Sequence, residues 1–330
     1  DATGTYSTAM GSNTDATGTY STAMGSNTDA TGDYSTAMGG GTEASGTAST
    51  AMGIGTESSG SNSTAMGYYT VATGLYATTM GSNTIAIGHS ATAMGRFTTA
   101  SGNSSTAMGN NTIATGDYST AMGGGTAIGY YSTAMGSNTE ASGNYSTAMG
   151  YETEARAYQL VIGKDNIPSG STTNWVSSDA AFIIGNGVNS PSNSLRATKD
   201  GNLFITGTLS SASDIRLKTN ITPVGNVLSA LEFITPITYE FKDTETHPAG
   251  LQIGFSAQEI QAQFPELVRE NAKGDLTVSY GQMSAVLLQA IKEQQAIIES
   301  QKTEIADMRA EIDGRLKAIE ETLNTTTLNK

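Results

Sequence analysis

The sequence lacks cysteine altogether and contains only two histidines in 330 residues. Without cysteine, disulfide bonds and thiolate metal ligands are excluded. The two histidines, His89 and His247, are too few to predict a histidine-based metal centre. We therefore predict neither a metal ion nor any other cofactor.

Basic residues and long apolar runs are also scarce. The chain has 16 Lys and Arg against 30 Asp and Glu, which gives a net charge of −14. Nucleic acids and anionic membrane surfaces attract basic proteins, so neither is a predicted partner. No signal peptide opens the chain, and no apolar run reaches the ~20 residues of a membrane helix, so membrane insertion is not expected. With 14 % charged residues and 39 glycines, no single large hydrophobic core is predicted either.

A short repeat fills residues 1–153. The opening fourteen residues, DATGTYSTAMGSNT, return as 15–28 and recur in eleven copies, one of which (127–139) has 13 residues. A fixed short period predicts a solenoid in which each copy stacks on the next. Because Asp1 already lies inside a repeat, we expect a further N-terminal part through which other tail or fibre proteins attach.

Each copy contains two patterns of period two. The first is Ser-x-Ala-x-Gly, as in Ser7, Ala9 and Gly11, and the second is Thr-x-Ala-x-Gly. Period two indicates strands whose small residues share one face. We predict coils of two short strands joined by glycine turns and stacked about 4.8 Å apart, so that eleven coils span roughly 50 Å. The glycine content argues against helices.

The opposite face of the first strand carries Thr and an invariant Met. An exposed apolar ladder of this length would aggregate, so we predict that copies of the chain bury it around a symmetry axis. Soft-metal binding is the alternative, but packing explains an identical Met at every rung better. The ladder comprises Met10, Met24, Met38, Met52, Met66, Met80, Met94, Met108, Met122, Met135 and Met149.

This rhythm resembles the head repeats of trimeric autotransporter adhesins of the YadA type. The resemblance covers residues 1–153 and implies a left-handed parallel β-roll in an intertwined homotrimer. Thr and Met stand where those heads carry bulky Val and Ile. Because the chain ends in a polar helix rather than in the membrane anchor of such adhesins, an autotransporter is not expected.

The turns carry most of the sequence variation. The pairs after Met-Gly include Ser12-Asn13, Tyr68-Tyr69 and Arg96-Phe97. Aromatic and Asn side chains on a rigid scaffold suit carbohydrate recognition, whereas mere tolerance of substitution explains the variation equally well. Tyrosines also precede the first strand of many copies, at Tyr6, Tyr20, Tyr34, Tyr76, Tyr118, Tyr131 and Tyr145.

Residues 154–212 are predicted to form a β connector. Two strand-like runs lie at 159–162 and 181–184, and residues 195–207 read as a hairpin turning on Asp200-Gly201. Trp175 is a candidate packing anchor.

Three motifs follow in order: SDIRLKTNI (213–221), IGFSAQEIQAQFPELV (253–268) and VSYGQMSAVLLQAIKE (278–293). They resemble the intramolecular chaperone auto-processing domain found at the C-termini of phage endosialidases, tail fibres and neck appendages, and of some membrane-bound transcription factors. The resemblance implies a small α+β domain at 213–285 that assembles the upstream trimer and is released by Ser/Lys self-cleavage. Carried onto this chain, the catalytic residues are Ser213 and Lys218. The supporting motif residues are Asp214, Arg216, Leu217 and Glu259.

The spacing of Ser213 and Lys218 limits how they can meet. Serine needs a base to become a nucleophile, and lysine is a base only when neutral, a form that burial favours. Five residues apart, two side chains lie about 140° apart on a helix and on opposite faces of a strand. The pair therefore needs an intervening turn or a lysine from a neighbouring chain, and we favour a geometry completed on trimer formation.

The bond that is cut also has two candidates. Attack by a serine hydroxyl on its own preceding carbonyl, through a five-membered ring, favours Ala212–Ser213, and the bond after Ser213 is the competitor. Any activity is expected to be a single self-cleavage, without turnover of external substrate. In the alternative without chemistry, Ser213 caps a turn, Lys218 is solvated and Glu259 serves helix packing.

Residues 286–330 are predicted to form a trimeric coiled coil and a frayed tail at 324–330. Isoleucine occupies every a position, and the d positions are Gln294, Gln301, Met308 and Arg315, which weaken the seam but fix its register. The a positions are Ile291, Ile298, Ile305, Ile312 and Ile319.

The sequence thus predicts a mainly β homotrimeric fibre with a chaperone and a coiled coil behind it. We interpret it as a phage tail fibre or receptor-binding appendage on the virion, whose partners are its own copies and a host surface receptor such as a glycan. A bacterial surface adhesin built from the same parts is the alternative. The roll shows no paired carboxylates of the glycosidase kind, which favours binding over depolymerisation, although a hydrolase domain upstream of Asp1 is a third possibility.

Overall fold

The structure is a computed structural model that describes the backbone of residues 1–328 and the side chains up to Leu323. The chain forms two compact units. Unit 1 comprises residues 1–210 and 242–248, and unit 2 comprises residues 211–241 and 249–330. In the described part of the chain, no helix combines the length and apolarity needed to cross a membrane.

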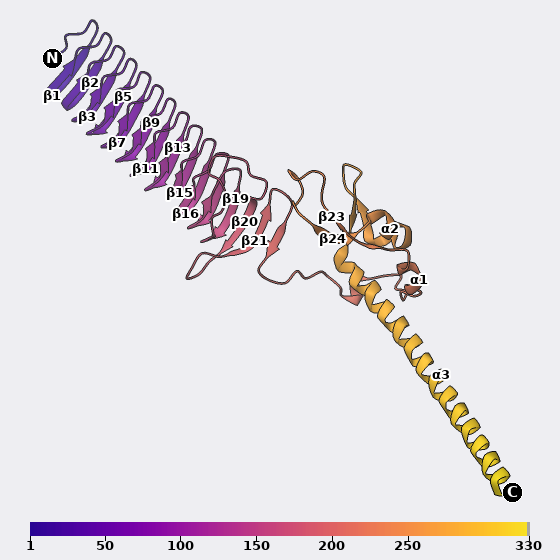
Figure 1. Ribbon diagram of the computed structural model, residues 1–330. Helices are drawn as coiled ribbons and strands as arrows, with labels where there is room; N and C mark the ends of the chain where they lie inside the picture. The colour runs from indigo at the N-terminus through magenta and orange to yellow at the C-terminus, as the bar shows by residue number, and fades with distance from the viewer. Residues whose placement is uncertain (329–330) are drawn as a thin grey trace. The chain divides into compact units, whose positions relative to one another are not determined.

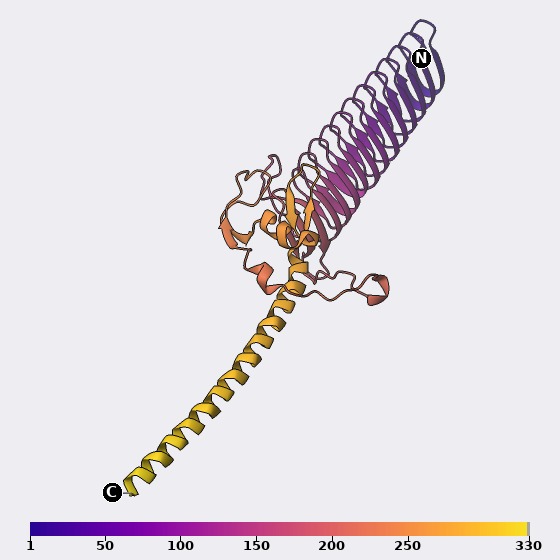
Figure 2. The same ribbon diagram turned by 90° about the vertical axis from the view of Figure 1, so that its right-hand side faces the viewer.

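The repeats form a parallel β-solenoid (Figures 1 and 2). The first strand of each coil begins at the Thr of Thr-Ala-Met-Gly or its equivalent: β1 (Thr8–Ala16), β2 (Thr22–Ala30), β3 (Thr36–Gly40), β5 (Thr50–Ile54), β7 (Thr64–Tyr68), β9 (Thr78–Ser82), β11 (Thr92–Arg96), β13 (Thr106–Asn110), β15 (Thr120–Ala127), β16 (Thr133–Ala141) and β17 (Thr147–Tyr151). The second strand is β4 (Glu43–Ala44), β6 (Glu57–Ser58), β8 (Val71–Ala72), β10 (Ile85–Ala86), β12 (Thr99–Ala100), β14 (Ile113–Ala114) or β18 (Glu154–Ala155). In β1, β2, β15 and β16 both parts run on as one strand.

Every coil pairs in register with its neighbours. Met10 lies opposite Met24, and Met24 lies opposite Met38, in parallel ladders. This register confirms the solenoid and the mainly β fold predicted from the 14-residue period. Glycine makes the close stacking possible: Gly11 has a φ of +128°, and a Cβ built on it would lie 1.9 Å from the carbonyl oxygen of Gly25.

Small side chains fill the interior of the solenoid. The strand alanines, from Ala16 and Ala23 onward, form fully buried columns. Columns of buried Ser and Thr lie beside them, and Ser63 Oγ donates a hydrogen bond of 2.6 Å to the carbonyl oxygen of Gly60. An interior of alanine and hydroxyl groups buries little apolar area, so the backbone ladder supplies much of what holds one coil to the next.

The parallel ladder continues beyond Thr153. β19 (Leu160–Lys164) pairs with β17, and β20 (Ala180–Asn186) pairs with β19, with Val161 and Ile183 in place of the buried alanines. The predicted hairpin is confirmed, since β21 (Asn193–Thr198) pairs antiparallel with β22 (Leu203–Ile205). Trp175 lies edge-on to Tyr158 at 5.5 Å but remains 58 % exposed.

The ladder places the missing residue in the turn at 123–126, just before the copy 127–139 to which the motif count assigns the short length. Thr126 aligns with Ile113 and Glu140, while Gly123 aligns with Gly136, so one turn residue is missing between them. A Cβ on Gly125 would lie 2.6 Å from the hydroxyl oxygen of Thr139. Glycine therefore allows a turn that is one residue shorter while the strands on both sides stay paired in the ladder.

Unit 2 is a small α+β domain followed by a long helix. Its elements are the 3₁₀ turn η1 (Ile215–Leu217), α1 (Leu228–Leu231), β23 (Pro236–Tyr239), β24 (Gln252–Phe255), α2 (Ala257–Gln263), η2 (Pro265–Leu267), β25 (Val268–Glu270), β26 (Leu276–Val278) and α3 (Tyr280–Leu328). β23 pairs with β24, and β25 pairs with β26, both antiparallel. Its core consists of Val227, Ile234, Ile260, Phe264, Leu267, Met283, Val286 and Ala290.

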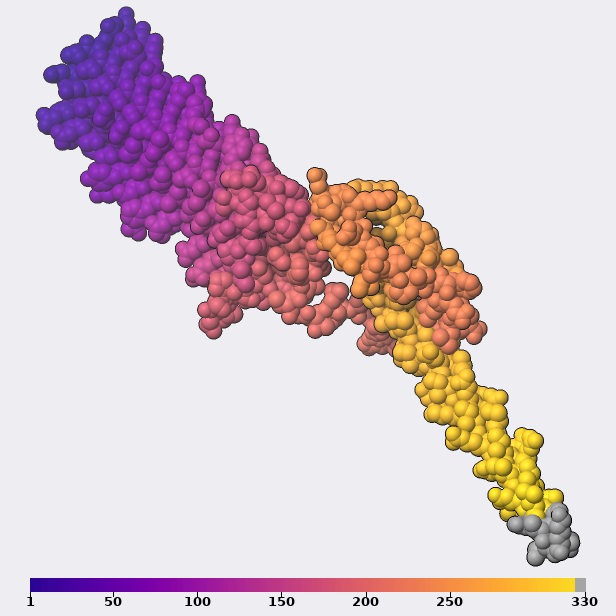
Figure 3. All heavy atoms as spheres, in the orientation of Figure 1, coloured from indigo at the N-terminus to yellow at the C-terminus, as the bar shows by residue number. Residues whose placement is uncertain are grey.

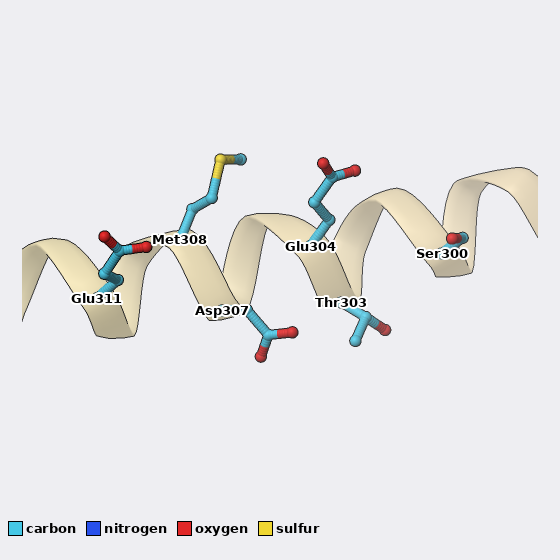
Figure 4. Close-up of a pocket in the computed structure, with 6 residues that line it drawn as sticks. All are labelled: Ser300, Thr303, Glu304, Asp307, Met308 and Glu311. Carbon is cyan, nitrogen blue, oxygen red and sulfur yellow. The ribbon is translucent and has the colours of Figure 1, made fainter.

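The first turns of helix α3 pack into that core, and the apolar residues further along the helix are exposed. Figure 3 shows its yellow end with no other segment of unit 2 packed along it. The five seam isoleucines are 42–62 % exposed. In Figure 4 Met308, a predicted d residue, extends from the helix on the same side as Glu304 and Glu311, and all the residues that line this groove come from α3 alone. The helix runs to Leu328 rather than ending at Leu323, and residues 329–330 of the predicted tail lie outside the described residues.

Candidate functional site

Ser213 lies in a long exposed segment that includes residues of unit 1 up to Ser210 and the first residues of unit 2. Every residue from 203 to 226 is exposed, and η1 is the one helical turn among residues 206–226. The segment starts at Leu203, the first residue of strand β22. It ends just before Val227, the first core residue of unit 2. The boundary between the two compact units, after Ser210, falls within it. A bond near Ser213 is therefore open to attack and lies at the junction of the two units in the sequence.

The 3₁₀ turn brings the two predicted catalytic residues together. The ammonium Nζ of Lys218 donates a hydrogen bond of 2.9 Å to Ser213 Oγ. The turn spans Ile215–Leu217, between the two residues, and reverses the chain so that side chains five positions apart face each other. The contact forms within one chain, through the intervening turn that the spacing allowed. A lysine from a neighbouring chain, part of the geometry we favoured, is not needed for it.

Asp214 and Arg216 hold this turn in shape. The Asp214 carboxylate caps η1 by accepting the backbone N–H of Arg216 at 2.9 Å, and it also pairs with the Arg216 guanidinium. Hydrogen bonds from the side chain and backbone of Arg216 lower the pKa of Asp214, and the carboxylate raises the pKa of Arg216 in return. Both groups are exposed, so the pair shapes the turn more than it stabilises the domain.

The surroundings of the pair decide what it can do chemically. As seen here, Lys218 donates to Ser213, whereas a general base must accept the serine proton. Burial would favour the neutral, accepting form of a lysine, and both side chains are exposed in the single chain. Leu217, beside them, is 75 % exposed although it is apolar. The two side chains make the contact that a Ser/Lys pair requires, and both are exposed in the single chain.

Glu259 lies at the start of α2 and has structural partners. Its carboxylate accepts the backbone N–H of Thr235 at 2.9 Å, and its own N–H donates to the hydroxyl of Ser256, the N-cap. These contacts tie α2 to the segment before β23. In this structure Glu259 therefore holds the start of α2 in place through hydrogen bonds.

Glu293, which closes the third motif, is a further structural residue that was not predicted from the sequence. Its carboxylate accepts the backbone N–H groups of Val227 and Leu228, at 3.1 and 3.0 Å, at the start of α1. A hydrogen bond from Gln289, followed by those from the backbone, lowers the pKa of Glu293. The sequence offers only a Glu that follows an apolar helical run. This pattern is too common to predict that its carboxylate caps another helix.

Among the described residues there is no group of three or more His, Cys, Asp or Glu side chains that could hold a metal.

The residues predicted to pack between copies of the chain lie on two surfaces, one on the solenoid and one on α3. The ladder methionines lie on the outside of the first strands, partly exposed, with Met10 at 56 %. The seam isoleucines lie along α3.

Two family models match the chain. The YadA head domain repeat matches residues 2–28, 30–56, 58–84, 81–104, 86–112, 100–126 and 127–153. The chaperone of endosialidase matches residues 213–269, starting at the serine that contacts Lys218. The chain joins YadA head repeats to an endosialidase-type chaperone domain. Comparison with curated proteins gives no match.

These matches confirm both resemblances drawn from the motifs. YadA head repeats and the endosialidase-type chaperone together support a trimeric fibre or adhesin that carries a chaperone domain. They point to an extracellular setting, either a phage tail or a bacterial surface appendage.

Proposed function

We propose that the chain forms a homotrimeric phage tail fibre or receptor-binding appendage that recognises a host surface. Its C-terminal domain drives trimer assembly and is released by self-cleavage at Ser213. The observation that carries the proposal is the 2.9 Å contact between Lys218 and Ser213, at the first residue of the matched chaperone segment and in the exposed junction after unit 1.

Two uncovered apolar faces support the assembly role. The methionine ladder runs the length of the head, and the seam isoleucines are about half exposed. A heptad of isoleucines at position a forms a stable seam only against other helices. A head whose interior consists of alanine and hydroxyl columns gains apolar burial by placing its methionines against other copies. One threefold axis would satisfy both faces.

The proposed cleavage is an acyl shift followed by hydrolysis. Ser213 Oγ attacks the carbonyl carbon of Ala212 while neutral Lys218 takes the hydroxyl proton. The C–N bond breaks, the Ser213 nitrogen leaves with a proton, and an ester links Ala212 to Oγ. Water then hydrolyses the ester and frees two chains. Trimer formation covers the exposed pair, which favours the neutral lysine.

The proposed domain boundaries follow from the same division of labour. Residues 1–153 form the head, 154–212 the β connector, 213–285 the chaperone and 286–330 the coiled coil with its tail. The connector extends the head ladder through β19 and β20 before the antiparallel hairpin. Helix α3 crosses from the chaperone into the coiled coil without a break, so assembly of the seam can order the chaperone core directly.

Denatured intact mass of freshly expressed protein tests the cleavage. Cutting Ala212–Ser213 gives fragments 1–212 and 213–330, whereas cutting after Ser213 gives 1–213 and 214–330. Ser213→Ala is expected to remain full-length, and Ser211→Ala, a serine in the same exposed segment, is expected to be cut like the wild type. A wild-type chain that stays full-length as an assembled trimer removes the catalytic roles of Ser213 and Lys218 and leaves the assembly role.

The second candidate function is a bacterial trimeric surface adhesin. The match of residues 2–153 to the YadA head domain repeat supports it, since such a head suits an adhesin as well as a tail fibre. Neighbouring genes discriminate between the two. Capsid or baseplate genes support the tail fibre, and secretion components support the adhesin.

A further inference from the structure

Most turn residues at the solenoid edge are small or Asn, and the larger ones are Tyr151-Glu152 in the last coil and those of one central stretch. We name this central stretch the turn-edge patch: Ile54, Tyr68, Tyr69, Asn83, Arg96 and Phe97. Its residues follow Met-Gly in four consecutive coils. Ile54 aligns with Tyr68, Tyr68 with Ser82, and Ser82 with Arg96. Backbone hydrogen bonds from Tyr69 to Ile54, from Asn83 to Tyr68 and from Phe97 to Ser82 fix the spacing along the edge.

The fold does not explain the aromatic residues of this patch. Tyr69 and Phe97 occupy left-handed backbone positions, with φ of 50° and 52°. Asn is favoured at such positions because its short polar side chain tolerates the conformation, whereas bulky side chains are strained there. Asn fills the equivalent position at Asn13, Asn27, Asn83, Asn111 and Asn138, with φ of 51–53°.

Burial does not offset that strain, although Tyr69 contacts Tyr68 of its own coil edge-on, with ring centroids 4.5 Å apart. Tyr69 is 52 % exposed and Phe97 is 45 % exposed. Tyrosines in the other edge column stack on the next coil, as Tyr6 does on Tyr20 at 4.9 Å. The coils next to Phe97 instead present Asn83 and Asn111 at this position, and those next to Tyr69 present Gly55 and Asn83. Exposed aromatic groups that lie outside the stacked tyrosine column indicate a binding surface.

The patch has a distinctive charge. Arg96 is the single Lys or Arg in residues 1–155, and no Asp or Glu occurs between Glu57 and Asp117. Its guanidinium lies 4.7 Å from the ring centroid of Phe97, so it is held beside the aromatic surface. The rest of the head is acidic, which repels anionic ligands except at this uncharged band around one Arg.

The two rings and the amide between them offer contacts that suit a sugar. Tyr69 and Phe97 are two coils apart, about 10 Å at the usual strand spacing, with the Asn83 amide between them. A pyranose presents an apolar C–H face to aromatic rings and hydroxyl groups to an amide. The Arg96 guanidinium binds a carboxylate through paired hydrogen bonds.

We infer that the turn-edge patch is a glycan-binding site for a carboxylate-bearing pyranose of a surface polysaccharide. This inference rests on the proposed receptor-binding function and names its ligand class and site. A second copy of the chain is a poorer occupant, because a symmetric contact through the patch would bring Arg96 residues together in a band without acids to neutralise them.

The experiment uses the full chain on an array of bacterial surface polysaccharides. Each acidic polysaccharide is present in its native and its carboxyl-reduced form, and neutral polysaccharides are included. The variants are Tyr69→Asn, Phe97→Asn and Arg96→Gln. The two Asn variants are expected to fold, since five other coils carry Asn at this position. Tyr131→Asn is the matched control, an exposed left-handed tyrosine that stacks in the other column.

We expect the wild type to bind at least one acidic polysaccharide and to lose that binding on carboxyl reduction. Each patch variant should bind it roughly tenfold more weakly or worse, and Tyr131→Asn should bind it normally. Wild-type binding that survives carboxyl reduction, binding to none of the acidic polysaccharides, or unchanged binding by the patch variants overturns the inference. Loss of the trimer in the patch variants also overturns it, since the patch would then be a contact between copies.

Adsorption to bacterial cells separates this inference from the proposed function. A wild-type fibre that adsorbs, and patch variants that adsorb equally well, refute the inference and leave receptor binding intact. A wild-type fibre that adsorbs to none of the cells tested refutes the receptor-binding function itself.

Discussion

Single glycine residues decide whether the coils of the solenoid can stack closely. The glycine after each ladder methionine has a positive φ and almost touches the same glycine one coil away. Adding one carbon there strains the backbone and collides with a carbonyl group that is fixed by its own ladder. The repeat therefore keeps this glycine in all eleven copies.

Gly67→Ala is expected to destabilise the head by about 2 kcal/mol or more, since strained φ values of this kind cost 1–3 kcal/mol before the collision is counted. A Cβ on Gly67 would lie 2.1 Å from the carbonyl oxygen of Gly81. Gly40→Ala is the control, because a Cβ on Gly40 meets nothing within 4 Å. Thermal unfolding followed by the strand signal in circular dichroism measures both. Equal melting temperatures for the two variants would contradict the steric argument.

At the scale of elements, helix α3 organises unit 2. Met283, Val286 and Ala290 enter its core, and Glu293 then caps the N-terminus of α1 with its carboxylate. A carboxylate at a helix start is favourable because it accepts unpaired N–H groups. One helix thus joins the chaperone core to the seam.

Glu293→Gln is expected to lower the stability of unit 2 at pH 7 and to reduce its loss in acid. The pKa of Glu293 is lowered in the folded state, so its contribution is fully present above the unfolded pKa, about 4.3, and is lost as pH falls through the folded value. Helix melting at 222 nm, compared at pH 7 and pH 3, measures this. A wild type and a variant that lose the same stability in acid would show that the cap does not carry the effect.

At the scale of the whole molecule, the processing pair and the trimer seam are proposed to be coupled. The pair is exposed in one chain, and the seam isoleucines lack a partner there. If assembly supplies the cover that favours neutral Lys218, cleavage reports that the fibre has formed.

Ile305→Lys is expected to prevent trimer formation and to slow self-cleavage more than tenfold, because it places three ammonium groups in one seam layer. Ala310→Lys adds the same charge at a predicted f position, away from the seam, and should assemble and cleave normally. Light scattering gives the oligomeric state, and intact mass against time gives the rate. Cleavage by Ile305→Lys at the wild-type rate, independent of dilution, would refute the coupling.

Much of the architecture could be predicted because its causes are local. The 14-residue period fixes the parallel register, and the seven-residue spacing of the isoleucines predicts the long helix α3. The role of Glu293 could not be predicted, because its partner Leu228 lies 65 positions earlier in the sequence and only the folded core brings α1 beside α3. The continuation of the ladder through β20 was also hidden, since its strands lack the repeat motif and pair only through backbone groups.

The sequence by itself determined the solenoid, because each coil repeats the small residues and glycines that close stacking requires. It also determined which serine and lysine belong together, through the motif around them. Only the tertiary structure decided how they meet: a 3₁₀ turn capped by Asp214 brings Lys218 to Ser213 within one chain. The five-residue spacing of Ser213 and Lys218 is compatible with a contact through a turn or with a lysine from a neighbouring chain. The hydrogen bonds of η1 form the turn, and the contact lies within one chain.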